Sequence, residues 1–451
     1  MPAAPAAPPR PRDRVLGVAL LCVIAAALFA DQNLMAPNLT AIARDFRLSA
    51  EERDVLLGGH VQFAFNLLAS VTALGVGYLA DRRARRPLFV AVIYLGALPC
   101  LFAGLARTYD EFFWMRALTG VGIGGASPLI YSLLGDFFPP GQRGRASSLF
   151  FLSSGLGIMA GQIMAGLVGP RLGWRLPFVL VAAPCLVLAL VFFALVREPA
   201  RGQAEAALAE VGVTGATAAR GFGALRRVLG VRTNQVLLTG IVVGTVPWAM
   251  LLVYMNDYFV QEKGFPVPEA TAVMAAFGVA TLGGAAAGGW LADRVARWDP
   301  RGVPLVSGAV GLAAALPLLA NIRWPSQAGA AEPRVLVPVL LSAVAGFLMM
   351  IPAPTGPLML LNVNAPESRG TAFSLERLAQ GVAYGVGPLV VGALIVGFGR
   401  QRAFELSLLF MPLSWLIGAT LARFYPRDAA ALEAELRART AAASPAAAGA
   451  A

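Results

Sequence analysis

Twelve apolar stretches, each long enough to cross a lipid bilayer, divide this chain of 451 residues. Hydrophobic residues make up 57% of the sequence and charged residues 14%, whereas soluble domains carry about 25% charged residues. A membrane-spanning helix needs about 20 apolar residues. The sequence therefore predicts an all-α membrane protein with spans at approximately 15–37, 54–79, 88–106, 112–135, 146–168, 176–196, 234–257, 270–292, 303–320, 335–361, 371–397 and 403–424.

Arginine is concentrated in the segments on one side of these spans, the side that holds both ends of the chain. By the positive-inside rule, this bias places both termini and the central linker in the cytoplasm. We expect a monomer in a bacterial inner membrane. The same bias accounts for the net charge of +11, so the expected partners are the bilayer and a small or lipid-like solute, and no nucleic acid.

Two sequence repeats divide the chain into like-oriented halves. The basic stretch at 77–86 returns in weaker form at 289–297, and the pattern P-x-x-R-G-x-A occurs at 140–146 and at 366–372. Repeats in corresponding loops are typical of transporters built from two related bundles. We therefore predict two pseudo-symmetric six-helix bundles, with the chain divided into a tail (1–14), a first bundle (15–196), a linker (197–233), a second bundle (234–424) and a tail (425–451). Within the linker, 222–230 is predicted to form a short basic helix on the membrane surface.

Few ionisable residues lie deep inside the apolar stretches. Asp31 lies in the first span and Arg116 in the fourth. Such a group costs about 2.5–3.5 kcal/mol on insertion scales, so it usually faces a cavity and has a partner. We expect these two side chains to face each other in a central cavity, either as a proton- or substrate-coupling pair or as a fixed brace.

Glu376, in the eleventh span, is a third candidate for coupling. Its neighbour Arg377 points about 100° away on a helix, and Gln380 and Tyr384 continue the Glu376 face as a polar track. The only histidine is interpreted as a hydrogen-bonded neutral residue, with proton relay as the alternative. The candidate polar and aromatic cavity residues are His60, Gln62, Asn66, Trp248, Tyr254, Gln380 and Tyr384.

Other functional classes lack their motifs. The glycines of the fourth and fifth spans are interpreted as close helix contacts, because small residues let helices approach. No Walker sequence and no Ser/His/Asp arrangement is present, and the three cysteines lie inside apolar runs. We therefore expect neither an enzyme nor an ATP-driven pump, and no cofactor or metal.

The stretch 77–86 resembles the loop signature of the major facilitator superfamily, G-x-L-a-D-r-x-G-r-r, with Ala84 where that motif usually has glycine. This resemblance implies two six-helix bundles around a cavity and alternating access. It implies a cytoplasmic latch in which Asp81 meets the start of span 11, while Arg85 meets Asp136. The residues assigned to this gate are Gly77, Asp81, Arg82, Arg85, Asp136, Arg143, Arg145, Asp293, Arg297 and Arg369.

Further stretches resemble the spinster subfamily, whose members move lysophospholipids and sphingosine phosphate. They are Asp31, 116–122, 154–157 and 196–199. The resemblance implies that Asp31 and Arg116 take part in proton coupling. The glutamate of that family in span 4 falls on Ile123 here.

The sequence thus predicts a secondary transporter that is proton-coupled and moves an amphipathic or lipid-like substrate. An exporter of drugs or small organic metabolites is the alternative within the class. A membrane sensor or scaffold without transport activity is the alternative from another class.

Overall fold

The computed structural model describes residues 11–80, 82–137, 143–196, 198, 222–299, 301–330, 334–365 and 368–443. Within these residues, twelve helical segments are long and apolar enough to cross a membrane. Each predicted span overlaps one of them, so the prediction of twelve spans is confirmed. The predicted boundaries differ from the observed ones because several helices continue beyond the apolar run into polar residues.

The first six spans contain two interrupted helices. Span 1 passes from an α-helix through two 3₁₀ turns into a second α-helix, and span 2 begins with a π-helix. The elements are α1 Pro11–Ala30, η1 Asp31–Asn33, η2 Ala36–Asn38, α2 Leu39–Asp45, α3 Ala50–Glu52, η3 Arg53–Val61, α4 Gln62–Ala80, α5 Arg85–Ala103, α6 Tyr109–Phe137, α7 Arg143–Leu172 and α8 Leu176–Leu195.

The second six spans repeat this feature, since span 7 is interrupted by a π-helix. The elements are α10 Phe222–Gly230, α11 Arg232–Ala249, η5 Met250–Tyr254, α12 Met255–Gln261, α13 Val267–Ala296, α14 Gly302–Ala313, α15 Ala315–Ile322, α16 Leu336–Met350, α17 Thr355–Val363, α18 Arg369–Phe398, α19 Arg400–Leu408, α20 Phe410–Ala419 and α21 Leu421–Ala443. The helix predicted within the linker is α10. The last helix, α21, continues from the twelfth span through Pro426 into the predicted tail.

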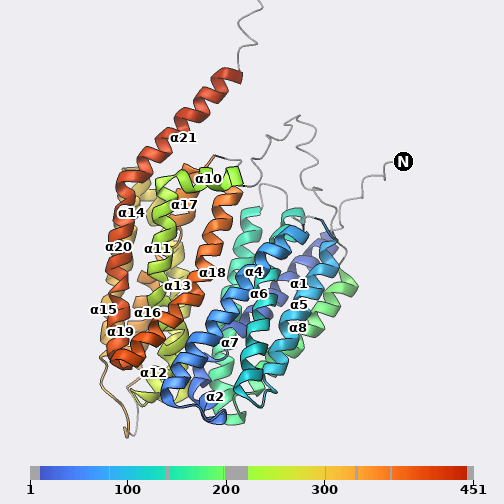
Figure 1. Ribbon diagram of the computed structural model, residues 1–451, viewed down its shortest axis with the longest axis vertical. Helices are drawn as coiled ribbons and strands as arrows, with labels where there is room; N and C mark the ends of the chain where they lie inside the picture. Colours follow the sequence, from blue (N-terminus) through green and yellow to red (C-terminus); the bar gives the residue numbers. More distant parts are fainter. Residues whose placement is uncertain are drawn as a thin grey trace, which may run out of the picture.

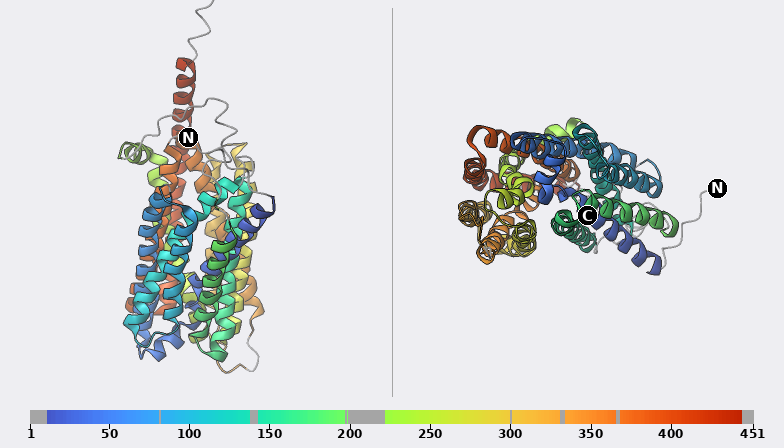
Figure 2. Two further views of the ribbon diagram at one scale, coloured as in Figure 1. Left: turned by 90° about the vertical axis from the view of Figure 1, so that its right-hand side faces the viewer. Right: turned by 90° about the horizontal axis from the view of Figure 1, so that it is seen from below.

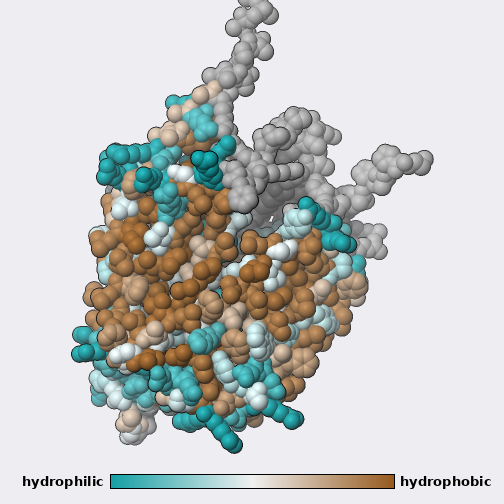
Figure 3. All heavy atoms as spheres, viewed as in Figure 1, coloured by the Kyte–Doolittle hydropathy of each residue, from teal (hydrophilic) through white to brown (hydrophobic). Residues whose placement is uncertain are grey.

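The helices form two six-helix bundles that stand side by side, α1–α8 in one and α11–α20 in the other (Figures 1 and 2). We call the end where α1 begins and α21 ends the termini side, and the opposite end the far side. Hydrophobic residues cover the middle of the molecule, while hydrophilic residues gather at both ends (Figure 3). This distribution matches a bilayer around the bundles.

Glycines bring helices of the first bundle into close contact, as predicted. A Cβ atom added at Gly124 of α6 would lie 1.9 Å from the backbone oxygen of Ala69 in α4, and one at Gly161 of α7 would lie 1.9 Å from that of Ala30 in α1. Any side chain at these two positions would therefore push the helices apart.

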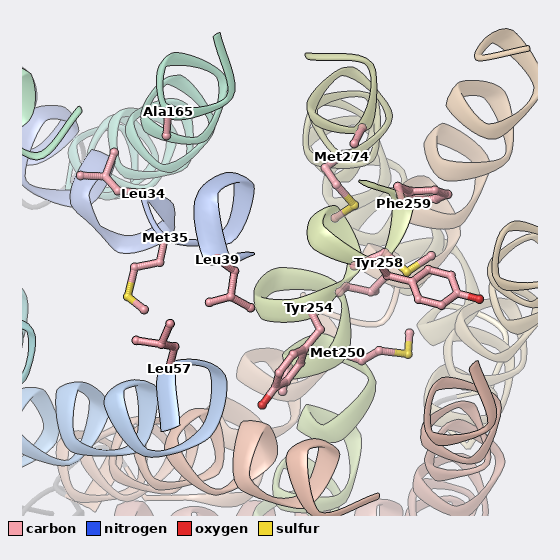
Figure 4. Close-up of a cluster of buried hydrophobic side chains, with 14 of the residues drawn as sticks. Leu34, Met35, Leu39, Leu57, Ala165, Met250, Tyr254, Tyr258, Phe259 and Met274 are labelled. Carbon is pink, nitrogen blue, oxygen red and sulfur yellow. The ribbon is translucent and has the colours of Figure 1, made fainter. Parts of the chain in front are cut away.

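The two bundles share a hydrophobic core towards the far side. Leu39 and Leu57 of the first bundle belong to the same buried cluster as Met250 and Tyr254 of the second, and Figure 4 shows Leu39 and Tyr254 between the helices of the two bundles. The bundles therefore meet through packed side chains at that level.

Candidate functional site

Asp31 and Arg116 form a buried ion pair. The Arg116 Nη1 atom donates to Asp31 Oδ1 at 2.5 Å, and Arg116 Nη2 donates to the Asp31 backbone oxygen at 3.3 Å. Both residues are at most 2% exposed. The pair forms because the helix of span 1 loosens at η1, immediately after Ala30, where the Asp31 carbonyl can accept a side-chain donor.

The pair lies inside the first bundle, and the expectation that it faces a cavity between the bundles is wrong. Cys100 of α5 donates its thiol to Asp31 Oδ1 at 3.1 Å. The Arg116 guanidinium lies over the rings of Phe65 and Phe178, 5.3 and 5.5 Å from their centroids. A small pocket beside Asp31 is lined by residues of α1, α5, α6 and α8 alone. The physical reason is that Arg116 projects from α6 towards α5 and α8, away from the second bundle.

The next two residues of the same turn face the second bundle. Gln32 and Asn33 line a narrow pocket together with Gln62 of α4 and with Leu252 and Val253 of η5. Broken helices at corresponding positions of two repeats often form substrate sites in transporters, because their free backbone groups line a cavity. The turn η1 therefore has the ion pair on one side and the pocket between the bundles on the other.

A second buried charge cluster joins the two bundles at the far side. In the first bundle, Asp54 accepts two bonds from Arg53, at 3.0 and 3.1 Å. It also accepts two from Arg400 of the second bundle, at 2.9 and 2.5 Å. Asp257 of the second bundle accepts the backbone N–H and hydroxyl of Thr40, at 3.2 and 2.6 Å.

Two further ion pairs, both to Asp257, complete this far-side cluster. Arg400 lies 2.8 Å and Arg53 lies 3.6 Å from Asp257 Oδ2. The four ionised side chains are two arginines and two aspartates, so their charges cancel. All four are buried. Most polar atoms of the cluster are hydrogen-bonded, but Asp257 Oδ2 and Arg400 Nη1 have no hydrogen-bond partner among the described residues. Removing one partner of a buried ion pair is costly, because it leaves the other charge uncompensated.

Tyr254 packs beside this cluster. Its hydroxyl donates to the backbone oxygens of Asp54 and Pro388, at 3.0 and 2.9 Å. The Asp54 carbonyl lies in the π-helix η3, where the regular α-helical hydrogen-bond pattern is interrupted. Tyr254 is thus a buried contact between the bundles rather than a residue that lines the predicted cavity.

Sequence reasoning missed the far-side cluster because its members lie near span ends, where charged residues usually face water. One signal was available. Arg53, Asp54, Asp257 and Arg400 all lie on the same side of the predicted topology. Charges of both signs at corresponding ends of neighbouring spans can pair across the halves.

The other predicted cavity residues are dispersed. Gln62 lines the pocket between the bundles. Asn66 donates to the backbone oxygen of Tyr384 across the bundles at 3.4 Å. Trp248 packs against Phe277, and His60 is exposed.

Glu376 is buried in α18, whereas its neighbour Arg377 is exposed. The Arg377 guanidinium donates to Gln380, so the expected polar track from Glu376 through Gln380 is replaced by a separate surface contact. In the residues that the structure describes, no three His, Cys, Asp or Glu side chains are grouped as a metal site would require.

At the termini side, the structure describes part of the predicted gate. Arg85 of α5 bonds to Glu198 and to Ser132, and the backbone N–H groups of Arg85 and Arg86 also donate to Glu198. Sequence reasoning missed Glu198 as a partner of Arg85. Asp81 and the side chains of Asp136, Arg143 and Arg145 lie outside the described residues.

The remaining predicted gate residues make local contacts. Arg82 stacks on the Tyr78 ring at 3.6 Å. Arg297 donates to the Asp293 backbone oxygen and Arg369 to that of Asn364. Gly77 has open space where a Cβ atom would be.

Twelve spans in two bundles, with charges that join the bundles at one end and a pocket between broken helices, define a membrane transporter of the alternating-access architecture. The family model for the Major Facilitator Superfamily matches residues 21–331. This chain belongs to that superfamily.

The chain is similar to a bacterial transport protein and to a human spinster protein. The chain is 26% identical over 377 residues to the cis,cis-muconate transport protein of Acinetobacter baylyi, covering 82% of this chain and 84% of that protein. It is 31% identical over 203 residues to protein spinster homolog 1 of Homo sapiens, covering 43% of this chain and 37% of that protein.

The same fold occurs in a solved structure. A bacterial homolog of the human lysosomal transporter spinster, in an inward-facing and unoccupied conformation, superposes with a TM-score of 0.80 at 19% identity. The superposition covers 93% of this chain and 99% of that one. It confirms the predicted fold.

Proposed function

We propose that this protein is a proton-coupled secondary transporter that moves an amphipathic, lipid-like solute by alternating access. The excess of arginine on the termini side supports a cytoplasmic location for that side, in a bacterial inner membrane. The far side would then face outward. The observation that carries the proposal is the arrangement of the two buried charge sites around the broken helices of the interface.

The far-side cluster would act as the outer gate. The polar contacts described above that join the bundles lie between Asn66 and the far-side end, and α4 and α18 separate towards the termini side (Figure 1). This geometry corresponds to a conformation closed outward and open inward. Outward opening would require Asp54 and Asp257 to separate from Arg400, while the four charges become hydrated.

The turn η1 supplies a route for coupling. Asp31 contacts Arg116 on one side of the turn, while Gln32 and Asn33 line the pocket between the bundles. A rearrangement at either site would shift the other, because Asp31 of the ion pair is followed directly in the chain by Gln32 and Asn33 of the pocket. The solute and the ion pair would therefore communicate through the backbone rather than by direct contact.

The pocket favours an amphipathic solute. Three amides (Gln32, Asn33 and Gln62) line it together with the apolar side chains of Met35, Leu39, Leu57, Leu252 and Val253. A strongly hydroxylated or multiply charged solute would need more polar binding partners than these three amides. The alternative, a drug or small organic metabolite exporter, would use the same pocket.

Flux into proteoliposomes tests the proposal. Labelled lysophospholipid, an unsaturated dicarboxylate and a cationic dye would each be offered with and without a pH gradient. We expect lysophospholipid flux that increases with the gradient. Preference for the dicarboxylate or the dye would support the alternative, and no flux of any solute would support a sensor or scaffold.

A further inference from the structure

Glu376 differs from the other buried carboxylates. Among the residues that the structure describes, the buried acidic side chains are Asp31, Asp54, Asp257 and Glu376. The three aspartates lie within 4 Å of an arginine nitrogen. Glu376, which is 8% exposed, makes no hydrogen bond or ion pair within the described part of the chain.

Its position explains the isolation. Glu376 lies two turns into α18, and its Oε1 atom lies 3.8 Å from the point where a Cβ atom on Gly356 of α17 would be. The carboxylate thus packs against a bare stretch of helix backbone. Arg377, the nearest cation in sequence, is exposed and bonds to Gln380 instead.

Few charges approach Glu376 from neighbouring elements. The ionisable groups on the elements that pack against α18 near this end are Arg226 and Arg227 of α10, Arg232 of α11 and Tyr78 of α4; α17 has none. The other charged contacts of α18 come from η3 and α19 near its far-side end, where they belong to the far-side cluster.

Burial without a charged partner disfavours an ionised carboxylate, so such a group takes up a proton more readily than an exposed one. Asp31 is in the opposite situation, because the Arg116 guanidinium lies 2.5 Å from its carboxylate. We propose that Glu376, rather than Asp31, is the buried group that takes up and releases the transported proton. This inference rests on the proposed proton coupling.

The step requires no other reactant. The Glu376 carboxylate takes one proton from water on the open side, forming a neutral carboxylic acid, and returns it to water when access changes. A change of conformation would alter the surroundings of α18, because Cβ atoms added at Gly381 and Gly385, about one and a half and two and a half turns further along, would meet Ser70 and Phe63 of α4 across the bundles.

Infrared difference spectroscopy of the purified protein in lipid, between neutral and acidic pH, tests the site without a substrate. The wild type should show the carbonyl band of a buried carboxylic acid that forms on acidification. We expect Glu376→Gln to lose this band, Glu376→Asp to keep it at a shifted midpoint, and Asp31→Asn to keep it unchanged. A band that persists in Glu376→Gln, or is lost in Asp31→Asn, would overturn the assignment.

Flux separates this inference from the proposed function. If wild-type flux responds to a pH gradient, Glu376→Gln should lose that response, while Glu51→Gln, which removes an exposed acid, should keep it. A response that survives in Glu376→Gln refutes the role of Glu376 alone. A wild type without any response refutes the proposed proton coupling, whatever the infrared result.

Discussion

At the scale of residues, the buried Asp31 carboxylate depends on two partners. Asp31 is held by Arg116 and Cys100, and its Oδ2 atom is buried without a partner. Because the pair is enclosed by α1, α5, α6 and α8, water cannot replace a lost partner. The effect of a substitution here should therefore depend on whether it leaves a charge behind.

Arg116→Ala should destabilise the protein by about 3–5 kcal/mol, because it leaves the Asp31 carboxylate buried and unpaired. The double variant Asp31→Asn/Arg116→Gln should recover most of this loss, since neither side chain is then charged. Thermal unfolding in detergent measures both. Equal loss in the single and double variants would show that packing, rather than charge, dominates.

Glu198 should make the stability of the termini side depend on pH. Burial acts to raise the pKa of Glu198, but hydrogen bonds from Arg85 and Arg86 hold it below the ordinary value of 4.5. A lowered pKa in the folded protein contributes stability above the ordinary pKa, and that contribution is lost as the pH falls through the lowered value.

Glu198→Gln should therefore lower the unfolding temperature at neutral pH and have a smaller effect in acid. The measurement is the difference in unfolding temperature between wild type and variant across the range from neutral to strongly acidic pH. A difference that stays constant with pH would mean that Glu198 contributes to stability through packing and not through its charge.

At the scale of elements, the interruptions of spans 1, 2 and 7 determine where the bundles touch. The π-helix η3 begins at Arg53, within the far-side cluster, and η5 ends at Tyr254. A π-bulge adds a residue to a helical turn and frees carbonyl groups. The Asp54 carbonyl of η3 is one of the two that accept the Tyr254 hydroxyl.

Gly58→Ala should weaken the contact between η3 and η5. A Cβ atom at this position would lie 2.3 Å from the Tyr254 ring, and overpacking of this kind costs about 1–3 kcal/mol. Outward closure should become less favourable, which a thermal shift and faster labelling of buried far-side positions would reveal. Gly75→Ala on α4 is the matched control, because its Cβ atom would meet nothing within 4 Å.

At the scale of the whole molecule, the far-side cluster connects the bundles through four balanced charges. Removing one arginine leaves an excess negative charge in the interface. Removing an acid as well would restore the charge balance and should make the closed interface more stable than in the single variant. The cluster can therefore be tested as a gate independently of any substrate.

Arg400→Ala should shift the protein towards an outward-open conformation. A cysteine introduced by Leu39→Cys, at a buried position, should react faster with a membrane-impermeant maleimide in this background. Arg400→Gln/Asp257→Asn should restore part of the protection, and Arg402→Ala, which removes an exposed arginine from the same helix, should have no effect. Unchanged labelling in Arg400→Ala would contradict the gate.

Particular residues show how much of the fold and of the candidate site could be predicted from the sequence. The spans were predictable because apolar runs of sufficient length have few other stable arrangements in a bilayer. A contact between Asp31 and Arg116 was predictable because two isolated opposite charges inside a membrane need partners. The side of the bundle on which they meet was not, because it depends on the rotation of α1 after its helix loosens at η1.

The far-side cluster and the isolation of Glu376 depend on the tertiary structure to a greater degree. Arg53, Asp54, Asp257 and Arg400 lie in three separate parts of the chain, and only the packing of the bundles excludes water from them. Glu376 appears in the sequence as one acid beside one arginine. Helix geometry predicts that Arg377 points elsewhere, but whether a cation from another helix approaches Glu376 depends on the packing.

The sequence by itself determined the class of protein, its twelve spans and its division into two halves, because hydrophobic length and repetition are properties of the chain alone. Only the tertiary structure decided which buried charges are paired and which are not. Pairing depends on distances of a few ångströms between helices that are far apart in sequence, and these distances are set by packing.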